Sequence, residues 1–159
     1  MNKQKMLVPY NFTMQDEKAI NYVMKTYVNE KAIEITLFHL YTPLAKYSQF
    51  HTGSTTSPVL TTVGEKTGKK ILTLKQKESD FNNLKNSFVE NGFPEDRINL
   101  SFSAKEESVG ESIIHKAGQD NYAIVVLSHT PRKGRMFIGE NVHEKVLNGL
   151  KDKVVIIVI

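Results

Sequence analysis

The sequence contains no cysteine among its 159 residues. This absence excludes a disulfide scaffold, thiol catalysis and zinc sites with cysteine ligands, and it fits a reducing compartment. Long apolar runs are missing too, because the longest is the six-residue end of the chain, 154–159, whereas a membrane-spanning helix needs ~20 apolar residues. No signal peptide is visible at the N-terminus. We therefore expect a cytoplasmic protein with no membrane partner.

A strong charge of either sign is also lacking. The 21 Lys and Arg residues against 17 Asp and Glu give a net charge of +4 at pH 7, and the two signs are mixed along the chain. The densest basic stretch, Lys66, Lys69 and Lys70, is more typical of a solvated helix or loop than of a nucleic-acid patch. We expect no nucleic-acid partner.

Motifs of catalysis and metal binding are equally scarce. The five histidines show no ligand spacing, and no G-x-S-x-G elbow is present. Residues 64–70 (GEKTGKK) resemble a P-loop, but they have three residues between the glycines instead of four, and Lys70 stands in place of Ser or Thr. We predict no catalytic residue and no metal site.

What the sequence does have is a regular alternation of apolar strands and amphipathic helices. Strands are expected at residues 5–10, 34–40, 97–104, 122–127 and 154–159, and helices at 13–27, 59–91, 108–118 and 142–150. This alternation predicts a single α/β domain over 1–159, with an open doubly wound five-stranded parallel sheet and helices on both faces. The last two strands are continuous apolar runs, so we expect both of their faces to be covered.

Local signals set several helix boundaries. Thr13 and Asp16 match a capping box, and so do Ser108 and Glu111. The adjacent acids Asp16 and Glu17 have a simple role toward the helix dipole. Glycines are expected to end two helices, one at Gly92 and one at Gly118. The buried side of the last helix is expected to consist of Val142, Val146, Leu147 and Leu150.

A doubly wound sheet binds ligands at the carboxyl ends of its strands, near the point where the strand order reverses. The residues expected at this place are Pro9, Asn11, Leu40, Ser128, Thr130, Arg132, Lys133, Gly139 and Asn141. Residues 41–58 form a long polar loop beside them, and loops of this length are usually functional or mobile. One alternative is therefore a small-ligand pocket that this loop closes, lined by Tyr41, Tyr47 and Phe50.

Four segments carry a resemblance to a known family: 6–11 (MLVPYN), 34–40 (EITLFHL), 123–129 (AIVVLSH) and 137–146 (FIGENVHEKV). In this order and spacing they resemble the universal stress proteins of the single-domain type, over essentially the whole chain. The resemblance implies the strand order 3-2-1-4-5 and a role in stress response. It also implies a homodimer, commonly formed by pairing the C-terminal strands across a two-fold axis.

The nucleotide-binding branch of that family carries G-x2-G-x9-G-(S/T) after the fourth strand, where small residues let backbone N–H groups approach phosphates. Here Leu127 and Thr130 replace the first two glycines. Gly139 matches the third glycine, but only eight residues separate it from Thr130, and Glu140 replaces the Ser or Thr. Pro9 also matches the family pattern. Asn11 stands where the family usually has an aspartate that contacts the nucleoside.

Two interpretations follow. In the first, the chain is a regulatory or binding protein with unknown protein clients, without catalytic activity, and a weak binder or non-binder of ATP. In the second, it is a sensor of ATP, AMP or another nucleotide, with or without slow hydrolysis. The basic side chains of Arg132, Lys133 and Arg135 would then hold a small phosphorylated ligand in place of the lost backbone contacts.

Overall fold

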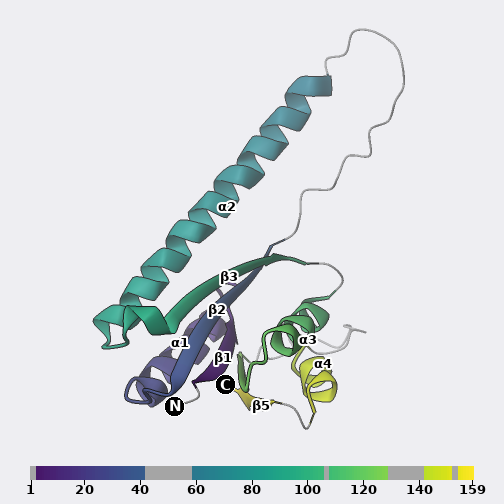
Figure 1. Cartoon of the computed structure of the whole chain (residues 1–159). Coiled ribbons are helices and arrows are strands. Elements are labelled where there is room, and N and C mark those ends of the chain that lie inside the picture. Colours follow the sequence, from purple (N-terminus) through teal and green to yellow (C-terminus); the bar gives the residue numbers. More distant parts are fainter. Residues whose placement is uncertain (1–2, 42–58, 106–107, 129–141, 152–153) are drawn as a thin grey trace.

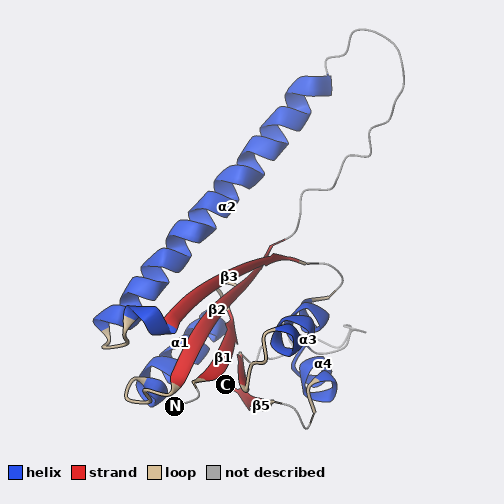
Figure 2. Cartoon of the chain, in the orientation of Figure 1, coloured by secondary structure: helices blue, strands red, loops and turns tan. Residues whose placement is uncertain are grey.

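The computed structural model describes residues 3–41, 59–105, 108–128, 142–151 and 154–159, with side chains described from residue 75 onward in the helix that begins at Val59. In the described part of the chain, five strands alternate with four α-helices (Figures 1 and 2). The elements are β1 (Gln4–Pro9), α1 (Met14–Tyr27), β2 (Ile33–Tyr41), α2 (Val59–Glu90), β3 (Ile98–Ala104), α3 (Val109–Gln119), β4 (Ile124–Leu127), α4 (Val142–Gly149) and β5 (Val155–Val158).

The sheet has the order β3-β2-β1-β4-β5 and every neighbouring pair is parallel. At its centre, Met6 of β1 lies between Ile35 of β2 and Ile124 of β4. This confirms the predicted fold class and strand order. Because all strands run the same way, their carboxyl ends meet at one edge of the sheet.

The helices form one layer on each face of the sheet. Helices α1 and α2 bury their apolar side chains on one face, against alternate residues of the central strands such as Met6 and Val8. Helices α3 and α4 cover the other face, where Leu7 and Val125 lie. In α2, Phe81 and Phe88 are fully buried in the core on the side of α1. The first part of α2 extends beyond the sheet (Figure 1).

Helix boundaries follow the predicted caps at most positions. The Thr13 hydroxyl accepts a hydrogen bond from the Asp16 backbone N–H, and the Asp16 carboxylate accepts one from the Thr13 backbone N–H, so the first capping box is confirmed. Gly92 adopts φ +97°, as predicted for a left-handed cap. Gly118 does not end α3. The helix continues through Gln119, and the chain turns at Asn121, whose φ is +54°. Asparagine tolerates this conformation better than most residues.

The last strand and helix are less covered than the sequence predicts. Val155 is 61% exposed and Val158 is 41% exposed, so the expectation that both faces of this strand are covered is wrong. The reason is its place in the sheet, since β5 is an edge strand that pairs only with β4 in the described chain. On α4, Val146 is buried as predicted, but Leu147 and Val142 are exposed, because this eight-residue helix covers the sheet with only one narrow side.

Candidate functional site

The strand order reverses between β1 and β4. The chain continues from β1 to α1 on one face of the sheet and from β4 to α4 on the other. This arrangement separates the loops at the carboxyl ends of β1 and β4 and is the usual place of a ligand site in a doubly wound fold. We call it the switch point, and of the described residues it includes 9–13 and Ser128.

A single carboxylate, that of Asp16, connects the two sides of the switch point. Its Oδ2 accepts hydrogen bonds from the backbone N–H groups of Asn11 at 2.9 Å and Thr13 at 3.2 Å. Its Oδ1 accepts a hydrogen bond from the Ser128 hydroxyl at 2.5 Å. The side chain is only 7% exposed, so these partners replace the water that a buried carboxylate requires.

The sequence places Asp16 in a capping box but does not reveal this wider role. The capping-box spacing is the one signal that could have found it, because it predicts that the carboxylate turns back toward the end of β1. The bond to Ser128 joins residues 112 positions apart, and no local pattern predicts it. The structure thus brings Asn11 and Ser128 together, with Asp16 between them.

Two other predicted site residues lie near the strand ends on the face covered by α3 and α4. Pro9 is the last residue of β1 and lies beside Phe38 of β2. Leu40 is half-buried, lies beside Ser103 of β3, and packs against the core of that face. The remaining predicted residues, Thr130, Arg132, Lys133, Gly139 and Asn141, lie outside the described residues. So do Arg135, Glu140, Tyr47 and Phe50.

An aromatic cluster lies beside the switch point on the face covered by α1 and α2. Phe12 follows Asn11 and has φ +62°, a conformation that costs a bulky residue about 1–2 kcal/mol. Its ring packs edge-on against Tyr10 at 4.8 Å and Phe81 at 5.2 Å between centroids. The Lys77 ammonium lies 3.8 Å from the centre of the Phe12 ring. These contacts hold the strained turn between β1 and α1 in place.

His39 of β2 belongs to the same cluster and ties it to β1. Its Nδ1 lies 3.1 Å from the carbonyl oxygen of Tyr10, which can only accept, so Nδ1 carries a proton and donates it. Burial lowers the pKa of His39, and the positive charge of Lys77 acts in the same direction, against the opposing effect of the bond to Tyr10. His39 therefore serves as a neutral structural link between the two strand ends.

Other functional classes find little support in the described residues. No group of three or more His, Cys, Asp or Glu residues there could hold a metal ion. Among the described helices, none combines the length and the apolar character that crossing a bilayer requires. Residues 64–70 lie inside α2 instead of between a strand and a helix, so the backbone cannot form a P-loop cradle there.

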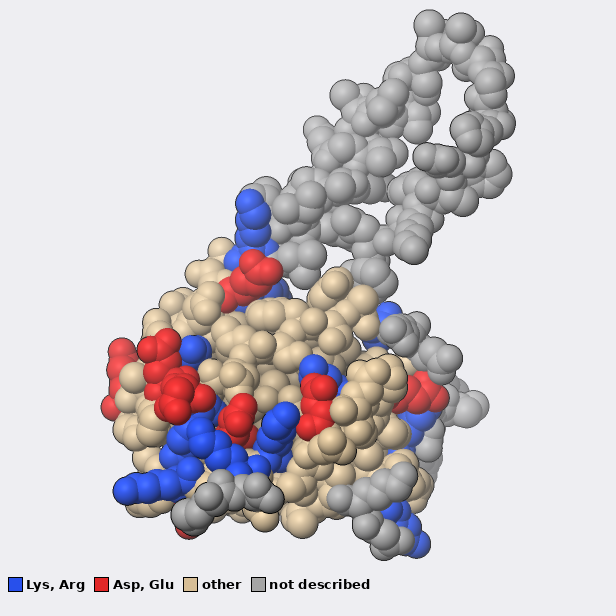
Figure 3. Space-filling view, viewed as in Figure 1, with Lys and Arg blue, Asp and Glu red and all other residues tan. Residues whose placement is uncertain are grey.

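The surface charges are mixed in sign. On the face shown in Figure 3, Lys and Arg side chains alternate with Asp and Glu over the described part of the chain. Several are paired, for example Lys3 with Asp96 at 3.8 Å and Lys116 with Asp120 at 2.8 Å. Nothing on this described surface resembles the single-sign stripe of a nucleic-acid binder.

No protein-family model matches the sequence, and the comparison with curated proteins finds no match. Solved structures do match. The universal stress protein UspA from Lactobacillus plantarum is 12% identical with a TM-score of 0.66, over 100% of this chain and 99% of that one. A universal stress protein family protein from Arabidopsis thaliana with AMP bound is 13% identical with a TM-score of 0.55, over 98% and 91%.

A third structure, a universal stress protein in complex with cAMP, is 10% identical with a TM-score of 0.56, over 100% of this chain and 98% of that one. Identities this low show a common fold and not a common ligand. The likeness extends from end to end of each chain, with the same doubly wound α/β architecture. The chain therefore has the fold of the universal stress proteins, as the resemblance of its strand-end segments predicts.

Proposed function

We propose that the chain is a non-catalytic regulatory or binding protein of the universal stress type, active in stress response, and that its switch point binds ATP weakly or not at all. The observation that carries this proposal is the position of Asp16. Its carboxylate accepts hydrogen bonds from Asn11, Thr13 and Ser128. Donors at this place in the fold are the ones that an anionic ligand would need.

The charge of Asp16 supports the same conclusion. A phosphate that approached these donors would have to displace a carboxylate that is already hydrogen-bonded and would then lie against its negative charge. Like charges a few ångströms apart in a partly buried site repel one another strongly. Leu127 and Thr130 replace two glycines of the family motif, and these replacements should also weaken phosphate binding. Glycine lets a backbone N–H group approach a phosphate closely, and a larger side chain hinders that approach.

The proposal is tested by isothermal titration of the full chain with Mg²⁺–ATP and with AMP. We expect no measurable binding by the natural sequence. The Asp16→Ala variant frees the N–H groups of Asn11 and Thr13 and the Ser128 hydroxyl, so we expect its affinity for either nucleotide to exceed that of the natural chain. Glu17→Ala, which removes an exposed acid from the next position, is the matched control and should bind no better. Tight binding by the natural chain would refute the proposal.

A second candidate function is a nucleotide sensor. It is favoured by two solved structures of this fold that hold cAMP or AMP, and by the basic residues Arg132, Lys133 and Arg135 in the sequence after β4. In this case the charged side chains would hold a small phosphorylated ligand. Replacing all three basic residues by Gln separates the two candidate functions. If the chain is a nucleotide sensor, the triple variant should lose the nucleotide binding that the natural chain shows in the titration.

We also propose that the chain forms a homodimer through β5 and works with protein clients in the cytoplasm. The edge of β5 that faces away from β4 bears no strand in the described chain, and its side chains Val155 and Val158 are exposed. An unprotected apolar edge strand invites pairing with another chain. A second copy that pairs along this edge would cover it, and the lack of cysteine fits a reducing compartment.

A further inference from the structure

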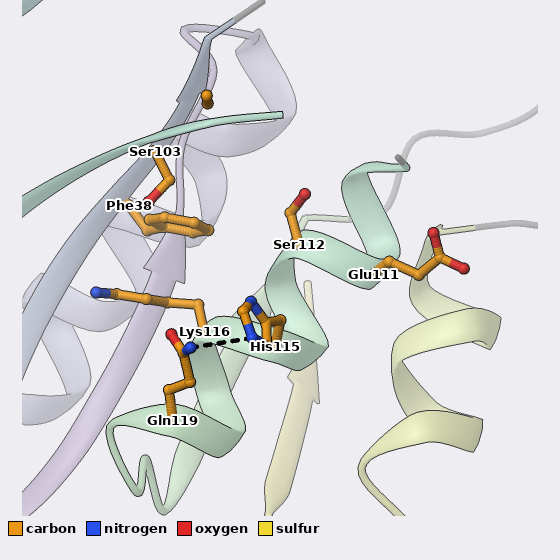
Figure 4. A pocket seen from close by; sticks show the side chains of 8 residues that line it. Phe38, Ser103, Glu111, Ser112, His115, Lys116 and Gln119 are labelled. Carbon is orange, nitrogen blue, oxygen red and sulfur yellow. Dashed lines mark hydrogen bonds between the residues drawn. The ribbon is translucent and has the colours of Figure 1, made fainter. Parts of the chain in front are cut away.

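A pocket of about 370 Å³ opens between α3 and the strands β2 and β3. Its size lies within the range of small-molecule sites, about 300–1,000 Å³. It is separate from the switch point, because Asp16 belongs to α1 on the opposite face of the sheet. Figure 4 shows its lining, to which these residues contribute: Phe38, Ser103, Ala104, Ser112, His115 and Gln119.

The pattern of β3 explains why a pocket forms here. Its Ile98, Leu100 and Phe102 pack into the core on the side of α1 and α2. The alternate residues, such as Ser101 and Ser103, lie beside Phe38 and Leu40 of β2 on the side of α3. Helix α3 packs over Leu7 and Val125 of the central strands. It therefore leaves the serine side chains at the β3 edge of the sheet partly uncovered.

The bottom of the pocket is apolar and its sides are polar. The Phe38 ring is buried and forms the apolar bottom of the pocket. The Ser103 hydroxyl has no hydrogen-bond partner among the described residues and projects from β3 beside the Phe38 ring (Figure 4). An apolar bottom under polar groups suits a ligand that has a flat apolar body and polar edges.

The two charged residues of the lining, Lys116 and Glu111, are each paired with a residue outside it. The Lys116 ammonium lies 2.8 Å from the Asp120 carboxylate. Glu111 turns away from Phe38 toward α4 (Figure 4), where its carboxylate meets the Lys145 ammonium at 2.6 Å. An ionic ligand would have to compete with these internal pairs, so a charge on the ligand gains little here.

Neutral groups remain to recognise a ligand. The Gln119 amide N–H donates to Nε2 of His115 at 3.0 Å, which leaves the Gln119 carbonyl oxygen as an acceptor. The neutral His115 ring then carries its proton on Nδ1, which is a donor. The Ser112 hydroxyl donates to the Ser108 carbonyl at 3.0 Å, and its lone pairs stay available as acceptors. Donors and acceptors are thus both present within one pocket.

We propose that this pocket binds a small, flat, uncharged heterocyclic molecule that carries both hydrogen-bond donors and acceptors. The proposal does not depend on the function assigned to the switch point. It follows from the volume of the pocket, its apolar bottom, the internal pairing of its charges and the neutral polar groups that remain on Ser103, Ser112, His115 and Gln119.

The test uses two probes that differ by one charge, nicotinamide and nicotinate, in a ¹H–¹⁵N NMR titration of the full chain. Nicotinamide should shift the backbone signals of Ser103, Ala104, Ser112 and His115. Nicotinate should bind more weakly by about tenfold or more, because its carboxylate finds no free partner. Absence of shifts with nicotinamide, equal or tighter binding of nicotinate, or shifts confined to the switch point would each overturn the proposal.

Two variants locate the binding. Gln119→Leu removes the acceptor while keeping the size of the side chain, and should weaken nicotinamide binding by about tenfold. Gln76→Leu on α2, whose amide bonds to Asp80, is the matched control and should leave binding unchanged. Ser103→Phe fills the pocket and should abolish binding while the NMR spectrum keeps its dispersion. Unchanged affinity in both Gln119→Leu and Ser103→Phe would contradict the assignment.

Discussion

The hydroxyl of Ser128 donates a 2.5 Å hydrogen bond to the carboxylate of Asp16, which joins the end of β4 to the first turn of α1. The same carboxylate also accepts hydrogen bonds from the backbone N–H groups that follow β1. One side chain thereby links the ends of the two strands at the switch point. A group this central, with three partners and little exposure, has consequences for both stability and binding.

Replacement of Asp16 by Asn should destabilise the fold by about 2 kcal/mol, because one carboxylate oxygen becomes an amide nitrogen that cannot accept a hydrogen bond. Urea unfolding followed by circular dichroism measures this change. Glu17→Gln removes the same charge from an exposed neighbour in the same helical turn and should change stability by less than about 0.5 kcal/mol. Equal effects of the two substitutions would show that Asp16 acts only through the helix dipole.

Stability should fall in mildly acidic solution because of His39. Its folded pKa lies below the unfolded value of about 6.5. Between these two values the unfolded chain binds more protons than the folded one, so the free energy of unfolding rises with pH in this window. The contribution of His39 is fully present above about 6.5 and is lost as the pH falls from there through the folded pKa. Urea titrations at several pH values measure the slope.

Two variants test the origin of this slope. His39→Phe removes the titrating ring and should abolish its share of the pH dependence, although the lost bond to the Tyr10 carbonyl lowers stability at every pH. Lys77→Met removes the neighbouring charge that helps to lower the pKa of His39 and should reduce the slope partially. If the free energy of unfolding depends on pH equally in both variants and in the natural chain, groups other than His39 cause the dependence.

Two glycines should respond to alanine in opposite directions. Gly92 has φ +97°, a conformation that costs an alanine roughly 1–2 kcal/mol, so Gly92→Ala should lower stability by about this amount. Gly118 lies within α3, and apart from its own turns of helix no described atom lies within 4 Å of the place that an alanine methyl group would take, so Gly118→Ala should raise stability by about 0.5–1 kcal/mol. Thermal unfolding measures both, and a loss of stability at Gly118 would contradict the observed helix end.

Substitution of Val155 by Lys should convert the proposed homodimer to a folded monomer, because it places a charge on the exposed edge strand. Val155 is a better position for this test than Ile157, since Ile157 packs against the core and its replacement would disturb the monomer as well. Val89→Lys, on the exposed end of α2, is the matched control. Light scattering measures the molar mass of each variant in solution. A Val155→Lys variant that is still a dimer would refute pairing through β5.

Much of the fold is predictable from the sequence because its signals are local and periodic. The alternation of strands and helices predicts a parallel sheet, and the capping box at Thr13 and the cap at Gly92 fall where expected. The predicted end of α3 is wrong because glycine is an ambiguous signal, permitted both inside a helix and at its end. The asparagine at position 121 adopts the left-handed conformation instead.

The candidate site is predictable only in part. Its location at the ends of β1 and β4 follows from the topology, and Asn11 and Ser128 lie there. The role of Asp16 is not predictable, because its bond to Ser128 depends on how distant strands meet. The pocket beside α3 also escapes prediction, since it depends on which part of the sheet a helix leaves uncovered, and a single sequence carries no signal for that.

The central claim is that the switch point does not hold ATP, because Asp16 takes the donors that a nucleotide would need. The most direct measurement is mass spectrometry of the small molecules released when the purified, natural chain is denatured. We predict that no adenine nucleotide is released in stoichiometric amount. Recovery of one ATP, AMP or cAMP per chain would contradict the account and favour the nucleotide sensor.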